Sequence, residues 1–150
     1  MNTPIPTTLN VVARYADGRL CKGTTRDFAP NRPEFHVHPE GNERSPVTIA
    51  LAALKAVFFV KSLVGRKEHV EEMDLANARG QGRRVMVTFK DGEMMAGFTV
   101  GYAADRPGFF LIPVDPTSNN MRVFVVNAAV ARVDFAAAGA ATAAGGRGAA

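Results

Sequence analysis

An internal repeat is the feature that most constrains the fold. Residues 11–39 align without a gap with residues 85–113, so that DGRLCKGTTRDFAPNRPEF in the first copy matches DGEMMAGFTVGYAADRPGF in the second. The identical pairs are Val11/Val85, Asp17/Asp91, Gly18/Gly92, Gly23/Gly97, Thr25/Thr99, Arg32/Arg106, Pro33/Pro107, Phe35/Phe109 and Pro39/Pro113. A chain that repeats such a pattern is predicted to build the same unit twice.

The repeat continues past this block. Two extra residues lie in the second copy's loop, and then VTIALAALKAVFF at 47–59 aligns with VFVVNAAVARVDF at 123–135. The match therefore covers two whole modules, which we place at residues 9–61 and 83–135. With 150 residues and 47% hydrophobic side chains, the chain is long enough to bury a core.

Both copies have the strand and turn patterns that are typical of an all-β unit. Apolar and polar residues alternate over 11–15 and over 85–89, and each stretch runs into an Asp-Gly pair that favours a tight hairpin turn. Gly23 and Gly97 fall inside the following strand, where they suggest a bend or bulge. Five short strands per copy are predicted to close as a small barrel, which gives two tandem small barrels from an internal duplication.

The segments outside the modules are polar or low in complexity. Residues 1–8 are expected to form a flexible N-terminus, and residues 62–82 a polar linker with one short helix over 67–78. The Ala/Gly-rich stretch 136–150 is predicted to be disordered.

Composition points to a soluble cytoplasmic protein that does not enter the membrane. From the polar start of the chain we expect no secretory leader, and one cysteine allows no disulfide within the chain. The longest apolar run in the modules, AVFFV, is far shorter than the roughly 20 residues that a membrane span requires.

Two stretches carry a resemblance to known families. YADGRLCKGT together with LAALKAV resembles the two motifs of Sm-like proteins, which are small SH3-like barrels. Over most of the chain, DGRLCKGTTRDFAPNRPEFHVHP with LKAVFFV looks like an uncharacterised bacterial domain family that occurs alone or beside signalling domains. This resemblance implies duplicated Sm-like or SH3-like barrels and a role in bacterial signalling, with no assigned chemistry.

The repeated Arg-Pro loops are the first candidate binding positions. Arg32 follows Asn31, Arg106 follows Asp105, and the proline after each arginine stiffens the turn. Two planar guanidinium groups could grip a phosphate or a partner's carboxylate. Alternatively, each arginine bonds to its own loop or pairs with Asp27 or Asp105.

A pair of histidines gives the second candidate site. His36 and His38 stand two apart on a predicted strand, so their rings share one face with a spacing that suits two metal ligands. No third ligand is marked, and the second copy has Phe110 in place of His36. We therefore predict a packing or partner-binding face, with no metal and no cofactor.

Nucleic acid is a second kind of partner to consider. The chain has a net charge of +4 and a pI near 9.6, and Arg79, Arg83 and Arg84 cluster in ARGQGRR. That cluster contains no aromatic residue for base stacking, and the nucleotide-binding residues of Sm-like proteins have no counterpart in APNRPEF or TIALAAL. An Sm-like RNA-binding protein is thus the alternative function.

The sequence contains no pattern that is typical of a catalytic site. Cys21 aligns with Met95, which favours a soft apolar side chain over a nucleophile, and no serine stands in a Gly-x-Ser-x-Gly context. The apolar strand KAVFFV must be covered or must join chains at an edge, which makes a homodimer or another protein partner plausible through the first module. We expect a non-enzymatic binding or regulatory adaptor.

Overall fold

The chain folds as an all-β protein, as the sequence predicts. The computed structural model describes residues 8–42, 44–63, 82–115 and 118–135. The strands are β1 Leu9–Tyr15, β2 Leu20–Thr25, β3 Glu34–Pro39, β4 Val47–Ala50, β5 Leu54–Val60, β6 Arg83–Phe89, β7 Met94–Thr99, β8 Gly108–Pro113, β9 Asn120–Val126 and β10 Val130–Phe135. Two 3-10 turns, η1 Leu51–Ala53 and η2 Asn127–Ala129, precede β5 and β10.

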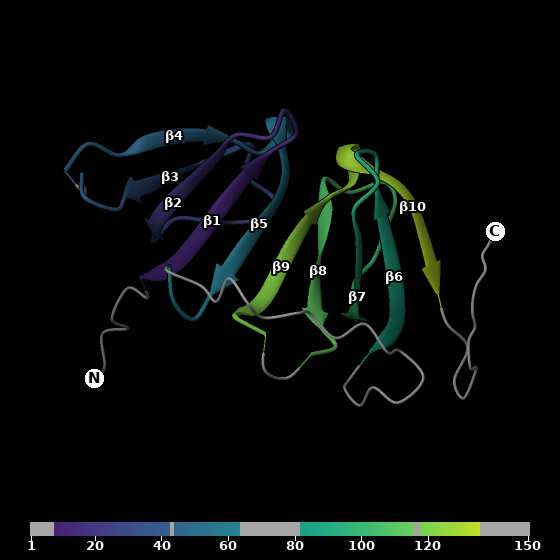
Figure 1. The fold of residues 1–150 in the computed structure, drawn as a ribbon. Helices are drawn as coiled ribbons and strands as arrows, with labels where there is room; N and C mark the ends of the chain where they lie inside the picture. The colour runs from purple at the N-terminus through teal and green to yellow at the C-terminus, as the bar shows by residue number, and fades with distance from the viewer. Residues whose placement is uncertain (1–7, 43, 64–81, 116–117, 136–150) are drawn as a thin grey trace, which may run out of the picture.

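All ten strands belong to one antiparallel sheet, in the order β10-β6-β7-β8-β9-β5-β1-β2-β3-β4. The first half of the protein (β1 to β5) and the second half (β6 to β10) occupy opposite ends of this order, and β5 and β9 lie side by side in the middle (Figure 1). The sheet is not closed into a barrel, so the expected pair of separate barrels is not what the chain forms. The physical reason is that β5 and β9 each find a hydrogen-bonding partner in the other half.

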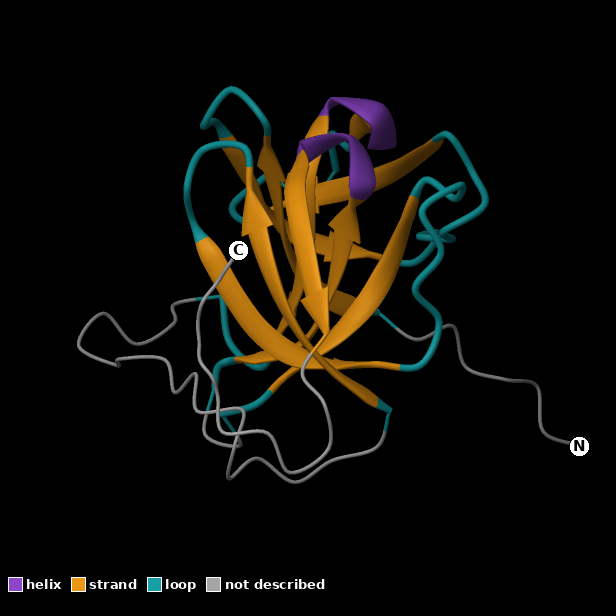
Figure 2. Cartoon of the chain, turned by 90° about the vertical axis from the view of Figure 1, so that its right-hand side faces the viewer, coloured by secondary structure: helices purple, strands orange, loops and turns teal. Residues whose placement is uncertain are grey.

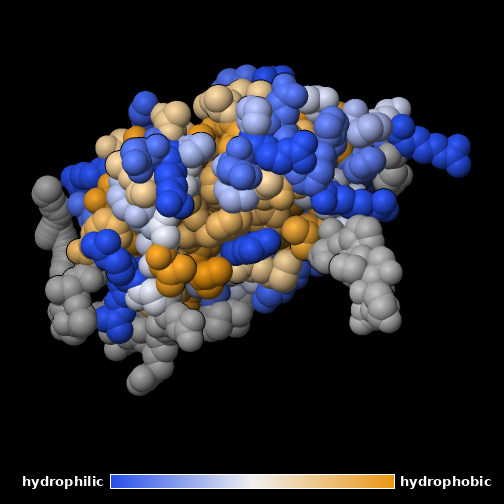
Figure 3. Space-filling model, turned by 180° about the vertical axis from the view of Figure 1, so that it is seen from behind, coloured by the Kyte–Doolittle hydropathy of each residue, from blue (hydrophilic) through white to orange (hydrophobic). Residues whose placement is uncertain are grey.

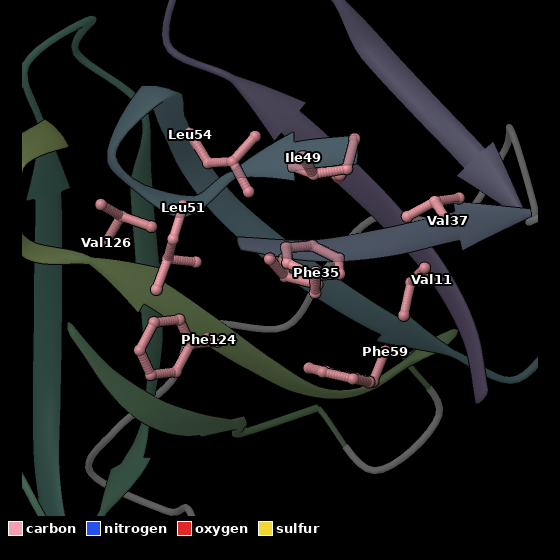
Figure 4. Packing of buried hydrophobic residues seen from close by; sticks show 11 residues of the cluster. Val11, Phe35, Val37, Ile49, Leu51, Leu54, Phe59, Phe124 and Val126 are labelled. Carbon is pink, nitrogen blue, oxygen red and sulfur yellow. The ribbon is translucent and has the colours of Figure 1, made fainter. Parts of the chain in front are cut away.

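The β5–β9 pairing also links the two cores, because each of these strands contributes side chains to both clusters. Along β5, Val57 and Phe59 pack into the cluster of the first half, while Phe58 packs into the cluster of the second half. From β9, Phe124 and Val126 point into the first half, beside the side chains of β3 and β5 (Figure 4). Both faces are therefore buried along the whole of β5 and over residues 123–126 of β9, which explains the apolar stretches AVFFV and VFVV.

The burial of β5 decides between the two alternatives for KAVFFV. All seven residues of the strand are buried, and β1 and β9 occupy its two edges. The expectation that this strand joins one chain to another is therefore wrong, because its partner lies within the same chain. In the described part of the protein, the strands with an unpaired edge are β4 and β10.

The Asp-Gly turns form as predicted. Gly18 and Gly92 have φ values of 99° and 94°, which L-residues with a side chain rarely adopt. The preceding aspartates complete the turns, since Asp17 Oδ1 accepts a 3.0 Å hydrogen bond from the Arg19 amide and Asp91 Oδ1 accepts one of 2.9 Å from the Glu93 amide.

Of the bend or bulge suggested at Gly23 and Gly97, the bulge is not formed. The pairing of β1 with β2 and of β6 with β7 keeps its register through both glycines. A Cβ at Gly23 would collide with the carbonyl oxygen of His38, and one at Gly97 would collide with that of Ile112. Glycine is needed because the backbones of β3 and β8, the sheet neighbours of β2 and β7, approach these positions too closely for a side chain.

Several expectations lie outside the described residues: the flexible N-terminus, the linker helix and the disordered C-terminal tail. Within the described ranges, no helix is long and apolar enough to cross a membrane.

Candidate functional site

The two Arg-Pro loops close with the same backbone hydrogen bond. The Arg32 amide donates to the carbonyl of Ala29 at 3.1 Å, and the Arg106 amide donates to that of Ala103 at 3.3 Å. These i to i+3 bonds define a turn just before each arginine side chain. The repeat of the arginine thus coincides with a repeat of its backbone conformation.

Each proline carbonyl then fastens its loop to a 3-10 turn. Pro33 accepts a 2.9 Å hydrogen bond from the amide of Leu51, the first residue of η1, and Pro107 accepts one of the same length from Asn127, the first residue of η2. Both 3-10 turns lie at the same end of the sheet (Figure 2), so both Arg-Pro loops do as well.

The second loop has an additional support. The side-chain nitrogen of Asn127 donates to the carbonyl of Ala103 at 3.0 Å and to that of Arg106 at 2.9 Å. Asn127 aligns with Leu51 of the first half, which has no such donor. The second loop is therefore held by both backbone and side chain.

The arginine side chains themselves are exposed. Within the described ranges, neither Arg32 nor Arg106 makes a side-chain hydrogen bond or an ion pair. The alternative pairing of Arg32 with Asp27 is not formed, since Asp27 bonds to His36 instead. Asn31 and Asp105, the preceding residues, are exposed beside them.

His36 is anchored by Asp27. The ring Nδ1 lies 2.7 Å from Asp27 Oδ2, and the His36 amide donates to Asp27 Oδ1 at 2.9 Å. A carboxylate can only accept, so Nδ1 carries the hydrogen of this bond. Thr25 donates to the same carboxylate at 3.2 Å.

These bonds change the acidity of Asp27. Partial burial disfavours its charged form, but the hydrogen bonds from His36 and Thr25 outweigh that effect and lower the pKa of the carboxyl below its usual value. Asp27 is therefore a fixed negative charge beside a half-exposed imidazole.

The second half replaces this pair. Phe110 stands where the first half has His36, and Gly101 stands where it has Asp27. Phe110 packs edge to face against Phe124, with ring centroids 5.1 Å apart, and lies against the core of the first half. His38 lies on the same outer side of β3 as His36 and is partly exposed.

A cation also lies over two aromatic rings where β5 and β9 join the two halves. The Arg122 guanidinium lies 4.7 Å from the centroid of Phe59 and 4.8 Å from that of Phe110. Sequence reasoning missed the contact with Phe59, because β9 and β5 belong to different halves.

A second missed feature is an ion-pair cluster between the halves. Lys55 of β5 has a side chain only 6% exposed, and its Nζ donates to Asp91 Oδ2 at 2.7 Å and also to Glu93 Oε1. Arg14 reaches the same Glu93 oxygen at 3.4 Å. The available signal was a single lysine inside an apolar run, since a buried cation requires a charged partner.

The nucleic-acid candidates are only partly described. Arg83 lies with its guanidinium 3.7 Å from the centroid of Phe135, so one of its faces is taken by an aromatic ring. Arg84 is partly exposed on β6, and Arg79 lies outside the described residues.

Metal-binding and nucleophilic groups are sparse. Across the described ranges, no group of three or more His, Cys, Asp or Glu side chains could hold a metal ion. Partial burial raises the pKa of Cys21, which keeps its thiol protonated and packed against the first core.

Some apolar side chains remain at the surface. The large ones are Leu20, Val47, Met94, Val100, Ile112 and Met121. Figure 3 shows that apolar residues gather across the middle of one face, with hydrophilic side chains around and among them.

Comparison with known proteins gives a family but no chemistry. No match was found among curated proteins or among solved structures. A family model described as a family of unknown function, DUF6982, matches residues 7–137, which include every strand of the sheet. The chain belongs to this family.

Proposed function

We propose that the protein is a non-enzymatic binding or regulatory adaptor that serves bacterial signalling. The observation that carries this proposal is the pair of Arg-Pro loops. Each is held by the same backbone hydrogen bonds, and each presents an exposed guanidinium without a side-chain partner in the described ranges. Polar groups on rigid loops at one end of a scaffold are typical of recognition sites.

The chemistry of the loops indicates the kind of partner. A guanidinium binds carboxylates and phosphates in a two-pronged geometry. Two such groups at one end of the sheet suit a partner protein that carries acidic or phosphorylated residues.

A second candidate function is Sm-like RNA binding. It is favoured by the net charge of +4 and the pI near 9.6. It is opposed by the absence of Sm-like nucleotide-binding residues from APNRPEF and TIALAAL. In addition, one face of the Arg83 guanidinium is taken up by the ring of Phe135.

We also infer that the halves descend from one duplicated unit of the Sm-like or SH3-like kind. In support, each half places its fifth strand beside its first, and each has a 3-10 turn before that fifth strand. The open sheet is then a fusion of two such units through β5 and β9.

The test is affinity capture from the source cell's extract, with and without nuclease and at low and high salt. The adaptor proposal expects a discrete protein that survives nuclease treatment. With that partner purified, the double variant Arg32→Ala/Arg106→Ala should bind at least about ten-fold more weakly. Arg26→Ala is the matched control, because Arg26 is exposed and bonds to Thr8 rather than lying in an Arg-Pro loop.

Other outcomes decide against the adaptor. RNA that is recovered at low salt and lost at high salt would favour the Sm-like alternative and direct mutagenesis to Arg83 and Arg84. Equal partner binding by the double variant and by the wild type would remove the Arg-Pro loops as the site. The double variant should melt like the wild type, since neither Arg32 nor Arg106 makes a side-chain hydrogen bond or ion pair in the described ranges.

A further inference from the structure

The edge strand β10 has a self-complementary charge pattern. Its sequence is VARVDF, with Arg132 and Asp134 on either side of Val133. Their side chains are 48% and 47% exposed and form an ion pair of 2.7 Å along the strand. Alternation along a strand places both charges on one face and Val133 on the other.

We propose that β10 is a docking edge for a second copy of this chain, joined by antiparallel β10–β10 pairing centred on Val133. In this register Val133 faces its own counterpart, and Arg132 of each chain faces Asp134 of the other. Both interchain pairs are of opposite charge, which stabilises directly opposed residues in a sheet. On the other face, Ala131 meets Phe135, so that a small side chain lies across from a large one.

The edge is available in the described part of the protein. β10 pairs with β6 along one side, from Val130↔Phe89 to Phe135↔Val85, and no described strand lies along its other side. An edge strand of this kind offers a row of unpaired backbone groups to another chain. A two-fold contact uses the same edge on both chains and closes as a dimer.

The β5–β9 junction inside the chain shows why β10 does not pair with β4 of another copy. In the repeat, β10 aligns with β5 and β4 aligns with β9. In the β5–β9 pairing, Ala56 lies opposite Val125 and Phe58 lies opposite Val123. The same register between β10 and β4 would place Arg132 opposite Ile49 and Asp134 opposite Val47.

Charges would then face aliphatic side chains. Pro46 aligns with Arg122, so Pro46 would lie opposite Phe135 with no N–H to donate. Continuation of the sheet from head to tail is therefore disfavoured, and the self-complementary β10 edge remains.

This inference is independent of the Arg-Pro loops, which lie in other segments of the chain. A six-residue strand contact is small, so the dimer is expected to be weak and to dissociate in the micromolar range.

The test is sedimentation equilibrium of the full chain from micromolar to millimolar concentration. The wild type should pass from monomer to dimer. Arg132→Asp and Asp134→Arg should each raise the dissociation constant about ten-fold or more, because both cross-strand pairs become like charges. The swapped double variant Arg132→Asp/Asp134→Arg restores opposite charges across the axis and should recover wild-type dimerisation.

Crosslinking checks the register. On a Cys21→Ser background, Val133→Cys should form a disulfide-linked dimer on mild oxidation, because each Val133 faces its counterpart. Ala131→Cys is the control and should not crosslink, since the two copies of residue 131 lie too far apart for a disulfide. Circular dichroism and urea melts verify that every variant is folded.

Three results would overturn the proposal: a chain that stays monomeric throughout, association into species larger than a dimer, or a dimer that the single charge reversals leave unchanged. A monomer would indicate that another part of the same chain covers the edge.

Discussion

β5 and β10 occupy the same position in the repeat but have different surroundings. β5 has a strand on each side and is buried over all seven residues, whereas β10 has a described strand on one side only and is at most partly buried. Their sequences follow this difference, since Ala56 and Phe58 of β5 align with Arg132 and Asp134 of β10. The comparison teaches that a repeated strand keeps its backbone role while its side chains adapt to the number of its neighbours.

β9 and β4 are likewise counterparts in the repeat with different surroundings. Substitutions in these two strands should show the largest difference in stability. Phe124 of β9 is 1% exposed in the core of the first half, whereas its counterpart in β4, Thr48, is exposed. Phe124→Ala should lower the free energy of unfolding by about 3–5 kcal/mol, and Thr48→Ala by less than about 0.5 kcal/mol. Urea denaturation measures both, and equal effects would contradict the shared core.

Substitutions of Gly23 and Gly97, which lie beside β3 and β8, should give the next largest effect. Gly23→Val and Gly97→Val each place a side chain against a backbone carbonyl and should destabilise by about 2–3 kcal/mol. Gly101→Val is the control, because nothing lies within 4 Å of a Cβ there. Melting temperatures that stay the same in all three variants would remove the close-packing argument.

The ion pairs between the halves sharpen the comparison further. Lys55→Met keeps the apolar stem but removes two charged hydrogen bonds, and should cost about 1–2 kcal/mol. The loss is smaller than for a fully buried pair, because Asp91 and Glu93 remain partly hydrated. Lys22→Met, at an exposed position, is the matched control and should be neutral in the same urea assay.

The smallest expected difference is in how Asp91 and Asp17 contribute to stability at acidic pH. The Lys55 side chain, and after it the Glu93 amide, lower the pKa of Asp91 below its ordinary value of 3.8. A carboxyl with a lowered pKa in the fold contributes stability above its ordinary pKa, and this stability is lost as the pH falls through the lower folded value.

The Asp17 pKa is also lowered, first by the Arg19 amide and then by the Arg19 side chain. Asp91→Asn should flatten the acid limb of the stability curve more than Asp17→Asn does, because only Asp91 links the halves. Thermal melts from neutral pH to below pH 3.8 measure this limb. An equal flattening by both variants would count against a special role for the junction.

A large part of the fold could be predicted from local patterns. The alternation around Val11 and Val85 and the two Asp-Gly pairs act over neighbouring residues, so they identify strands and hairpin turns directly. The candidate residues Arg32 and Arg106 were also visible, because they repeat. The loop conformation that holds them depends on a 3-10 turn distant in sequence and could not be predicted.

The sequence by itself determined that this chain repeats one all-β unit with tight Asp-Gly turns. Only the tertiary structure decided that β5 pairs with β9, that Lys55 bonds to Asp91 and Glu93, and that His36 bonds to Asp27. Backbone hydrogen-bonding groups are the same in every strand, so they do not specify which strand lies beside which. That choice depends on burying both faces of β5 and β9 at once, which requires both halves to be folded together.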